Sequence, residues 1–189
     1  MDAFLVSFGV IFVAELGDKS QLMALAFATR YRPVPVLIGI TVATAVVHAM
    51  SVVFGAVVGA QLPTDTINVV AGIAFFVFAA WTLRGDELDE AEAARASRTT
   101  RSAVIAVGFA FLLAELGDKT MLATVTLATR EGLFGTWLGS TVGMVAADAL
   151  AIVVGRHLGA RLPERAVRIG ASVAFVVFGV LLIVDGLRG

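Results

Sequence analysis

The sequence predicts an all-α membrane protein with six transmembrane helices, arranged as a 3+3 inverted-topology internal repeat. Of its 189 residues, 59% are hydrophobic and 15% are charged, whereas soluble domains carry about 25% charged residues. Self-similarity at a fixed offset of 100 residues predicts the repeat. The lack of cysteine excludes disulfides and thiolate chemistry, and a net charge of −1 argues against a nucleic-acid partner.

Each predicted span approaches the ~20 apolar residues that an α-helix needs to cross a bilayer. We place the spans at residues 3–29, 34–60, 66–84, 102–129, 133–158 and 166–187. Turn-like segments such as RYRP, LPTD and LPER separate several of them. The chain begins MDAFLVSF, without the basic region of a secretory signal, so we expect the first span to be retained.

Three parts follow along the chain. A first three-helix repeat occupies residues 1–84, a charged linker residues 85–101, and a second three-helix repeat residues 102–189. The linker, GDELDEAEAARASRTTR, is the only long polar stretch. We expect it to be a solvated linker that can contain a short helical turn.

The two repeats align without a gap over most of their length. Matching pairs include Glu15 and Glu115, Arg30 and Arg130, Gly39 and Gly139, Leu62-Pro63 and Leu162-Pro163, and Phe75 and Phe175. Because each repeat has three spans, an odd number, the second copy enters the membrane upside down relative to the first. Many secondary transporters follow this plan.

Loop arginines predict the orientation. If both termini share one side, that side carries only Arg130 and Arg188. The other side carries Arg30, Arg32, Arg84, Arg95, Arg98, Arg101, Arg156, Arg161, Arg165 and Arg168. The positive-inside rule makes the arginine-rich side cytoplasmic, so we expect both termini outside and the linker in the cytoplasm.

The candidate chemistry lies in two copies of one heptapeptide. AELGDKS occupies residues 14–20, AELGDKT occupies residues 114–120, and these motifs hold the only two lysines of the chain. A charged side chain at the bilayer centre costs roughly 2.5–3.5 kcal/mol on insertion scales, so such groups need a polar interior and partners.

The motif acids predict a metal site. Glu15 and Asp18 are three residues apart and share one helix face, as do Glu115 and Asp118. In an inverted repeat both pairs converge near the midplane, where four carboxylates could surround one ion. Oxygen ligands suit Ca²⁺, Mn²⁺ or Mg²⁺. The motifs also supply supporting groups: Lys19 and Lys119 to temper repulsion, Ser20 and Thr120 hydroxyls nearby, and Gly17 and Gly117, which permit either close approach or a local break.

A second polar layer comes from the same offset. His48, near the middle of the second span, matches Asp148 in the fifth, at the depth of the motifs. We interpret them either as groups that line the site or as helix-packing residues. Gln21 lies beside the motif, but its partner by repeat is Met121, which makes it the weaker candidate.

The charge balance of the site indicates a mechanism. Five acids (the four motif carboxylates and Asp148) and two lysines leave a formal charge of −3. A dry site with that charge must hold a divalent metal or protons. Because metal and protons compete for the same oxygens, alternating exposure of the site would exchange one for the other.

The doubled motif E-x-G-D-(K/R)-(S/T), with six spans and an acidic central loop, resembles the GDT family of membrane cation/proton antiporters. The resemblance implies Ca²⁺/Mn²⁺ exchange for protons, as in Golgi and chloroplast relatives, and metal export of the bacterial manganese-exporter type. It also implies that the Glu, Gly, Asp, Lys and Ser/Thr of each motif form half of the ion site. His48 and Asp148 fall outside that signature.

We therefore expect a secondary transporter in a bacterial plasma membrane, exporting metal, with lipid and a divalent cation as partners. No cofactor and no catalytic residue are expected. The alternatives are an uncoupled channel or permease for another solute, and more remotely an intramembrane hydrolase. The aspartyl membrane protease motif G-x-G-D begins with Gly, whereas this chain has Glu15 or Glu115 at that position. The oligomeric state, the stoichiometry and the choice between Mn²⁺ and Ca²⁺ stay open.

Overall fold

The computed structural model describes residues 3–84, 90–97, 102–158 and 164–188. Nearly all of these residues are helical, and no strand occurs among them. The helices are α1 (Ala3–Glu15), α2 (Lys19–Ala28), α3 (Pro33–Gly59), α4 (Thr64–Arg84), α5 (Glu90–Ser97), α6 (Ala103–Glu115), α7 (Lys119–Ala128), α8 (Leu133–Leu158) and α9 (Glu164–Arg188). The predicted all-α class is confirmed.

Four of the described helices, α3, α4, α8 and α9, are long and apolar enough to cross a membrane. Helices α1 and α6 are apolar but shorter. Large apolar side chains lie exposed on the outer faces of the long helices; Val53, Phe54 and Val57 of α3, for example, are each about 60% exposed. Exposed apolar surface of this extent is typical of a protein whose surroundings are lipid.

The first and fourth predicted spans are not continuous helices, contrary to a simple reading of residues 3–29 and 102–129. Each is interrupted inside the heptapeptide, between α1 and α2 and again between α6 and α7. Gly17 has φ of 75° and Gly117 has φ of 85°, a left-handed conformation that favours glycine. The sequence left open whether these glycines permit close helix approach or a local break, and in the structure each lies in a local break.

Residues related by the 100-residue offset meet in space. Helices α4 and α9 pack side by side, and Phe75 lies 5.8 Å from Phe175 between ring centroids. In the centre α3 packs against α8, where Thr44 Oγ1 donates to Met144 Sδ over 3.4 Å. Helix α1 lies on α8 and α6 lies on α3, so the corresponding pairs of the two repeats pack alike.

Glycines permit the close approach of these helices. Gly139 and Gly143 of α8 lie against the backbone of α1, where an added Cβ at Gly143 would come 2.7 Å from the Phe8 carbonyl oxygen. Gly39 of α3 lies in the same way against α6, with the Val104 carbonyl oxygen 2.9 Å from such a Cβ. Small residues at helix interfaces are the usual means of tight packing in membranes.

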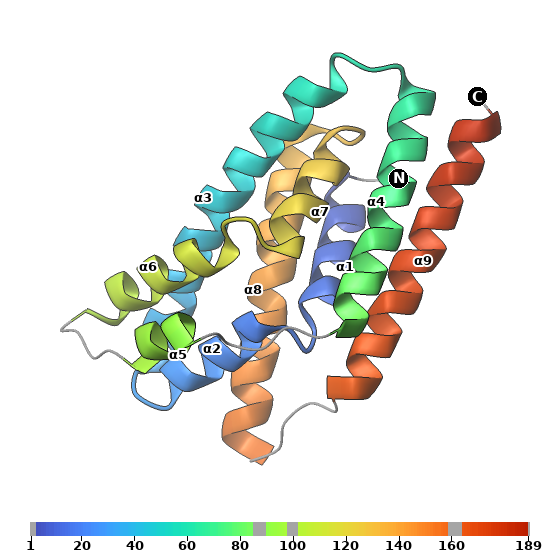
Figure 1. Cartoon of the computed structure of the whole chain (residues 1–189). Helices are drawn as coiled ribbons and strands as arrows, with labels where there is room; N and C mark the ends of the chain where they lie inside the picture. Colours follow the sequence, from blue (N-terminus) through green and yellow to red (C-terminus); the bar gives the residue numbers. More distant parts are fainter. Residues whose placement is uncertain (1–2, 85–89, 98–101, 159–163, 189) are drawn as a thin grey trace.

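The start of α1 and the end of α9 lie at the same end of the molecule, as expected if both termini are on one side of the membrane (Figure 1). Helix α5 lies toward the opposite end and packs against α2 and α6. Most α5 residues whose burial is described are exposed, so the expectation of a solvated linker fails only at Glu92, which is 5% exposed. Residues 85–89 and 98–101 of the predicted linker lie outside the described part of the chain.

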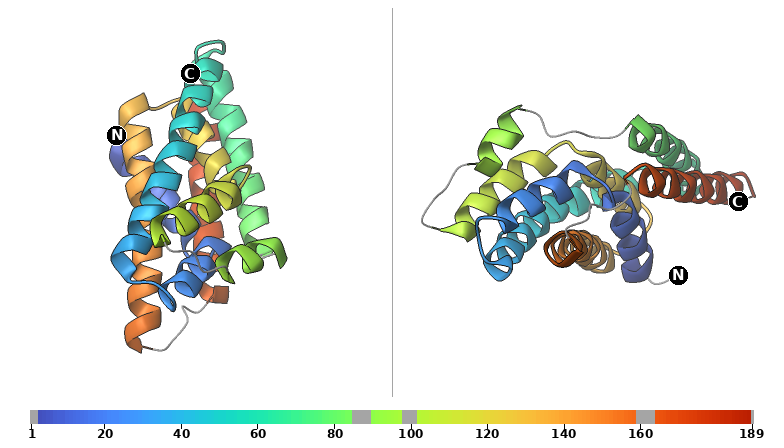
Figure 2. Two further views of the ribbon diagram at one scale, coloured as in Figure 1. Left: turned by 90° about the vertical axis from the view of Figure 1, so that its left-hand side faces the viewer. Right: turned by 90° about the horizontal axis from the view of Figure 1, so that it is seen from below.

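The broken helices cross the bundle obliquely. Figure 2 shows α2 and α6 beside each other at the end of the bundle that carries α5, next to α3. The second interruption is itself exposed at Leu116 (43%), but the acids beside both interruptions are buried: Glu15, Asp18, Glu115 and Asp118.

Candidate cation site

Each heptapeptide places its two acids on opposite sides of a helix break. Glu15 is the last residue of α1, and Asp18 immediately precedes α2 with φ of −81° and ψ of 164°. Glu115 and Asp118 hold the same positions between α6 and α7. Neither aspartate caps its helix through its side chain, but each lies at a helix N-terminus, where a negative charge is favoured.

The lysines of the two motifs join the repeats. Lys119 donates to Asp18 Oδ1, so the second repeat compensates the aspartate of the first. Reciprocally, Lys19 Nζ lies 3.5 Å from Asp118 Oδ1. The structure thus brings both motifs together, and the predicted tempering of acidic repulsion takes the form of ion pairs that cross from one repeat to the other.

The motif glutamates are deeply buried. Glu15 is 0% exposed and Glu115 is 1% exposed. Within the described residues neither Glu15 oxygen has a hydrogen-bond partner, and Glu115 accepts a 2.9 Å bond from Thr120 at Oε2 only. The Glu15 carboxylate also interacts electrostatically with Glu115 and with the other buried acids, Asp18 and Asp148. Buried carboxylates without partners are costly unless a cation or a proton joins them.

The helix breaks are held by side chains four residues after each glycine. Gln21 Oε1 accepts a 2.8 Å bond from the Gly17 amide, and its Nε2 donates over 2.8 Å to the Ala147 carbonyl on α8. Met121 takes the same place in the second repeat, where its Sδ lies 3.1 Å from the Gly117 amide nitrogen. Although their residue types differ, Gln21 and Met121 therefore both contact the amide of the glycine in the helix break. Gln21 also connects its break to Ala147, the residue before Asp148.

His48 and Asp148 are both completely buried, on α3 and α8. Asp148 interacts electrostatically with Asp18, and neither of its oxygens has a hydrogen-bond partner in the described chain. The two ring nitrogens of His48 likewise lack a partner among those residues. Both side chains thus face the protein interior, and Asp148 lies within electrostatic range of the motif acids.

The predicted shell of four carboxylates around one ion is not gathered in this conformation. No three acidic or histidine side chains of the described residues lie close enough to hold a single metal. Instead, Asp18 and Asp118 each pair with a lysine of the other repeat. A cation that bound Oδ1 of either aspartate would compete with the lysine ammonium that lies there.

One residue of the site was missed by sequence reasoning. Glu92 on α5 lies with its Oε1 3.1 Å from Lys19 Nζ, and its side chain is 6% exposed. It belongs to a run of acids in a polar linker, and nothing in that pattern distinguishes it from Glu90, which is exposed. Only the docking of α5 against α2 and α6 brings it to the motif.

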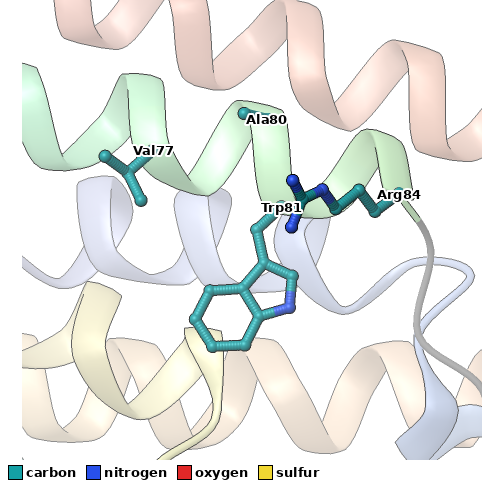
Figure 3. Close-up of a pocket in the computed structure, with 4 residues that line it drawn as sticks. All are labelled: Val77, Ala80, Trp81 and Arg84. Carbon is teal, nitrogen blue, oxygen red and sulfur yellow. The ribbon is translucent and has the colours of Figure 1, made fainter.

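A cavity of about 400 Å³ lies along the C-terminal half of α4, lined by Val77, Ala80, Trp81 and Arg84. Figure 3 shows the side chains of Val77 and Trp81 projecting from α4 on the side away from α9. None of these four lining residues is acidic. The cavity is therefore separate in chemistry from the carboxylate cluster.

Glycines make close contacts of different kinds at the two ends of the bundle. Gly59 of α3 lies directly against the backbone of Thr129, next to the end of α7. At the opposite end Gly155, on α8, meets the Leu25 side chain of α2 instead of backbone. Asp185 of α9 also ties the first end together, accepting from Asn68 over 2.8 Å and pairing with Arg130 at 3.3 Å.

Comparison with known proteins points to one family. The family model described as "Divalent cation/proton antiporter GDT1" matches residues 3–90 and 103–189. A protein of Vibrio cholerae named "Putative manganese exporter" is 34% identical over 171 residues, covering 89% of this chain and 84% of its own length. A GDT1-like protein of Synechocystis is 28% identical, covering 96% of both chains. A chloroplastic GDT1-like protein of Oryza sativa is 32% identical, covering 94% of this chain and 59% of its own. No solved structure matches significantly.

Proposed function

The chain belongs to the GDT1 family of divalent cation/proton antiporters, and we propose that it exchanges Mn²⁺ or Ca²⁺ for protons across the membrane. The family resemblance expected from the doubled motif is thereby confirmed. The transported cation is the substrate, and the chemistry required of the protein is binding and release rather than catalysis.

One observation carries the proposal: both acidic motifs meet in the interior, with Glu15 buried and neither of its oxygens hydrogen-bonded in the described chain. Intramembrane ionisable groups of this kind mark ion and proton pathways. Oxygen ligands are the donors that Ca²⁺ and Mn²⁺ prefer. The name of the Vibrio relative supports Mn²⁺ as the first substrate to test.

We assign the metal site to Glu15, Asp18, Glu115 and Asp118. When the metal binds, Lys19 and Lys119 withdraw from the aspartates, because cation and ammonium compete for the same oxygens. When the metal leaves, protons and the lysines restore charge balance. Ser20 Oγ, 3.5 Å from Asp18 Oδ2, and the Thr120 hydroxyl on Glu115 are placed to support these carboxylates in either state.

We propose that six spans form a 3+3 inverted repeat. In this arrangement α1 with α2, α3 and α4 make the first three spans, and α6 with α7, α8 and α9 make the second three. Support comes from the matched packing of α1 on α8 and of α6 on α3, and from contacts between offset-related residues. Broken helices whose ends meet at the midplane are the usual ion sites of such transporters.

We propose that this conformation is closed toward the outside. The arginine-rich loops favour a cytoplasmic position for α5, which puts both termini outside. At that outer end, Gly59 packs on backbone and Asp185 joins three segments. At the cytoplasmic end Gly155 meets the Leu25 side chain of α2, which can change rotamer when α2 moves, whereas a backbone contact cannot adjust in this way. Export then proceeds by loading metal from the cytoplasm and exchanging it for external protons.

The test is Mn²⁺ flux in proteoliposomes with and without a pH gradient, repeated with Ca²⁺ and Mg²⁺. We expect a gradient that is acidic on the far side to accelerate metal movement toward that side, since protons displace metal from the carboxylates there. Flux that ignores the gradient would favour an uncoupled channel or permease. The variant Glu90→Cys tests the orientation of α5 in the membrane. If a membrane-impermeant thiol reagent added outside intact cells labelled this cysteine, the proposed topology would be wrong.

His48 and Asp148 are proposed to line the pathway. An imidazole nitrogen shifts preference toward Mn²⁺ over Ca²⁺, so His48→Ala should slow Mn²⁺ transport more than Ca²⁺ transport. Asp148→Asn should flatten the pH dependence of exchange or lower turnover for both metals, because the carboxylate holds either metal or proton. Competition flux assays with the two metals measure both effects. If the ratio of Mn²⁺ to Ca²⁺ transport rates were unchanged in His48→Ala, His48 would have only a role in helix packing.

A further inference from the structure

The linker helix α5 delivers one carboxylate to the cation site. Along α5, Glu90 and Ala91 are exposed, as are Ala93 and Ala94, whereas Glu92 between them is 5% exposed. The helix packs on α2 and α6, the two oblique helices of the broken spans (Figures 1 and 2). Glu92 is thus the α5 residue that contacts the heptapeptide of the first repeat, through Lys19.

Lys19 lies between two carboxylates. Its Nζ is 3.1 Å from Glu92 Oε1 and 3.5 Å from Asp118 Oδ1, so the nearer acid is the one from the linker. Lys119, the counterpart of Lys19 in the other repeat, pairs directly with Asp18, and its side chain is 4% exposed against 18% for Lys19. The two cross-repeat ion pairs are therefore unequal, and the longer one involves the lysine that Glu92 also holds.

We propose that Glu92 is a positioning residue of the transport site, which draws Lys19 toward itself and so weakens the competition of the Lys19 ammonium with a divalent cation for the Asp118 carboxylate. This inference rests on the proposed antiport function and adds to it a residue outside both motifs. The physical basis is that one ammonium divides its attraction between two acids, and the charge-assisted contact with Glu92 is the shorter.

Removing the charge of Glu92 should strengthen the competition between Lys19 and the metal. In Glu92→Gln the amide keeps the shape of the side chain, but Lys19 then has Asp118 as the nearer negative partner. The KM for Mn²⁺ should rise about tenfold or more, because this is the change in affinity that corresponds to the free energy of one charge-assisted hydrogen bond. The rise should appear only at the face that carries the linker, with kcat near the wild-type value, because binding rather than translocation is weakened.

The experiment measures Mn²⁺ flux in proteoliposomes from each face separately, for the full-length wild type, Glu92→Gln and Glu90→Gln. Glu90→Gln is the matched control, since it removes an acid from the same helix at an exposed position. A wild-type KM in Glu92→Gln, or an equal rise at both faces or in the control, would overturn the inference. Wild-type protein that carries no metal would instead refute the proposed function.

A double-mutant cycle tests whether Glu92 acts through Lys19. Once Lys19 is replaced, the loss of Glu92 should add nothing, so Lys19→Gln and Lys19→Gln/Glu92→Gln should share one KM for Mn²⁺. A further large rise in the double variant would contradict the proposal and assign Glu92 a direct role with the cation. If Glu92→Gln alone fails to insert, the double variant, which is neutral at both positions, can still refute the proposal, since a KM for Mn²⁺ above that of Lys19→Gln would contradict it.

Discussion

Glu15→Gln and Asp118→Asn are each expected to abolish proton-coupled Mn²⁺ transport while leaving a folded, membrane-inserted protein. Each change removes a negative oxygen from the proposed ligand set. Rates should fall more than about 100-fold, since even groups behind metal ligands contribute about 10–100-fold to affinity. A neutral amide also cannot take part in the exchange of metal for protons.

The fold should survive both changes for reasons visible in the structure. Neither oxygen of Glu15 is hydrogen-bonded within the described residues, so neutralising this buried group removes a desolvation cost and breaks no bond. In Asp118→Asn, Lys19 keeps its 3.1 Å contact with Glu92. Thermal unfolding in detergent should therefore stay near the wild-type temperature.

Proteoliposome flux and thermal unfolding, measured on the same samples, check both halves of this prediction. Asp65→Asn is the control, because Asp65 is an exposed acid in the first turn of α4, far along the chain from both motifs. It should transport like the wild type. Near-normal flux in either motif variant would return the heptapeptides to a purely structural role.

The second large effect is on stability. Lys119→Met is expected to destabilise the protein by about 3–5 kcal/mol, the usual cost of removing one partner from a buried ion pair. Asp18, which would be left behind, is 1% exposed. The repeat-equivalent Lys19→Met should cost less, since Lys19 is more exposed than Lys119.

The double variant Asp18→Asn/Lys119→Met separates stability from transport. With both charges gone, the loss of the Lys119 ammonium no longer leaves a negative charge at position 18, and most of the lost stability should return. Transport should stay absent because a proposed ligand is missing. Thermal unfolding and Mn²⁺ flux report the two quantities independently. If the double variant were as unstable as Lys119→Met, the ion pair across the repeats would not be what holds these segments together.

Much of the helical content and the duplication could be predicted from composition and spacing. The boundaries of α3 and α8 agree with the predicted spans 34–60 and 133–158 to within a residue, because long apolar runs between turn signals leave few alternatives. The interruptions at Gly17 and Gly117 could not be predicted in this way. A glycine between two acids permits both a continuous helix and a break, and local sequence does not choose between them.

The partners of the charged residues were beyond sequence reasoning. Lys119 and Asp18 are 101 residues apart in the chain, and their contact depends on where two broken helices cross. A pattern within one heptapeptide predicted only that Lys19 and Lys119 would reduce repulsion. Which aspartate each lysine meets is set by the packing of α2 and α7 around α3 and α8.

By itself the sequence determined the helical class, the duplication and the identity of the acidic motif, since these follow from residue types and their spacing along the chain. The tertiary structure decided that the two repeats exchange lysine–aspartate pairs and that Glu92 joins them from α5. The reason is physical: the energy of a buried charge depends on what surrounds it within a few ångströms, and that neighbourhood is assembled from segments far apart in sequence.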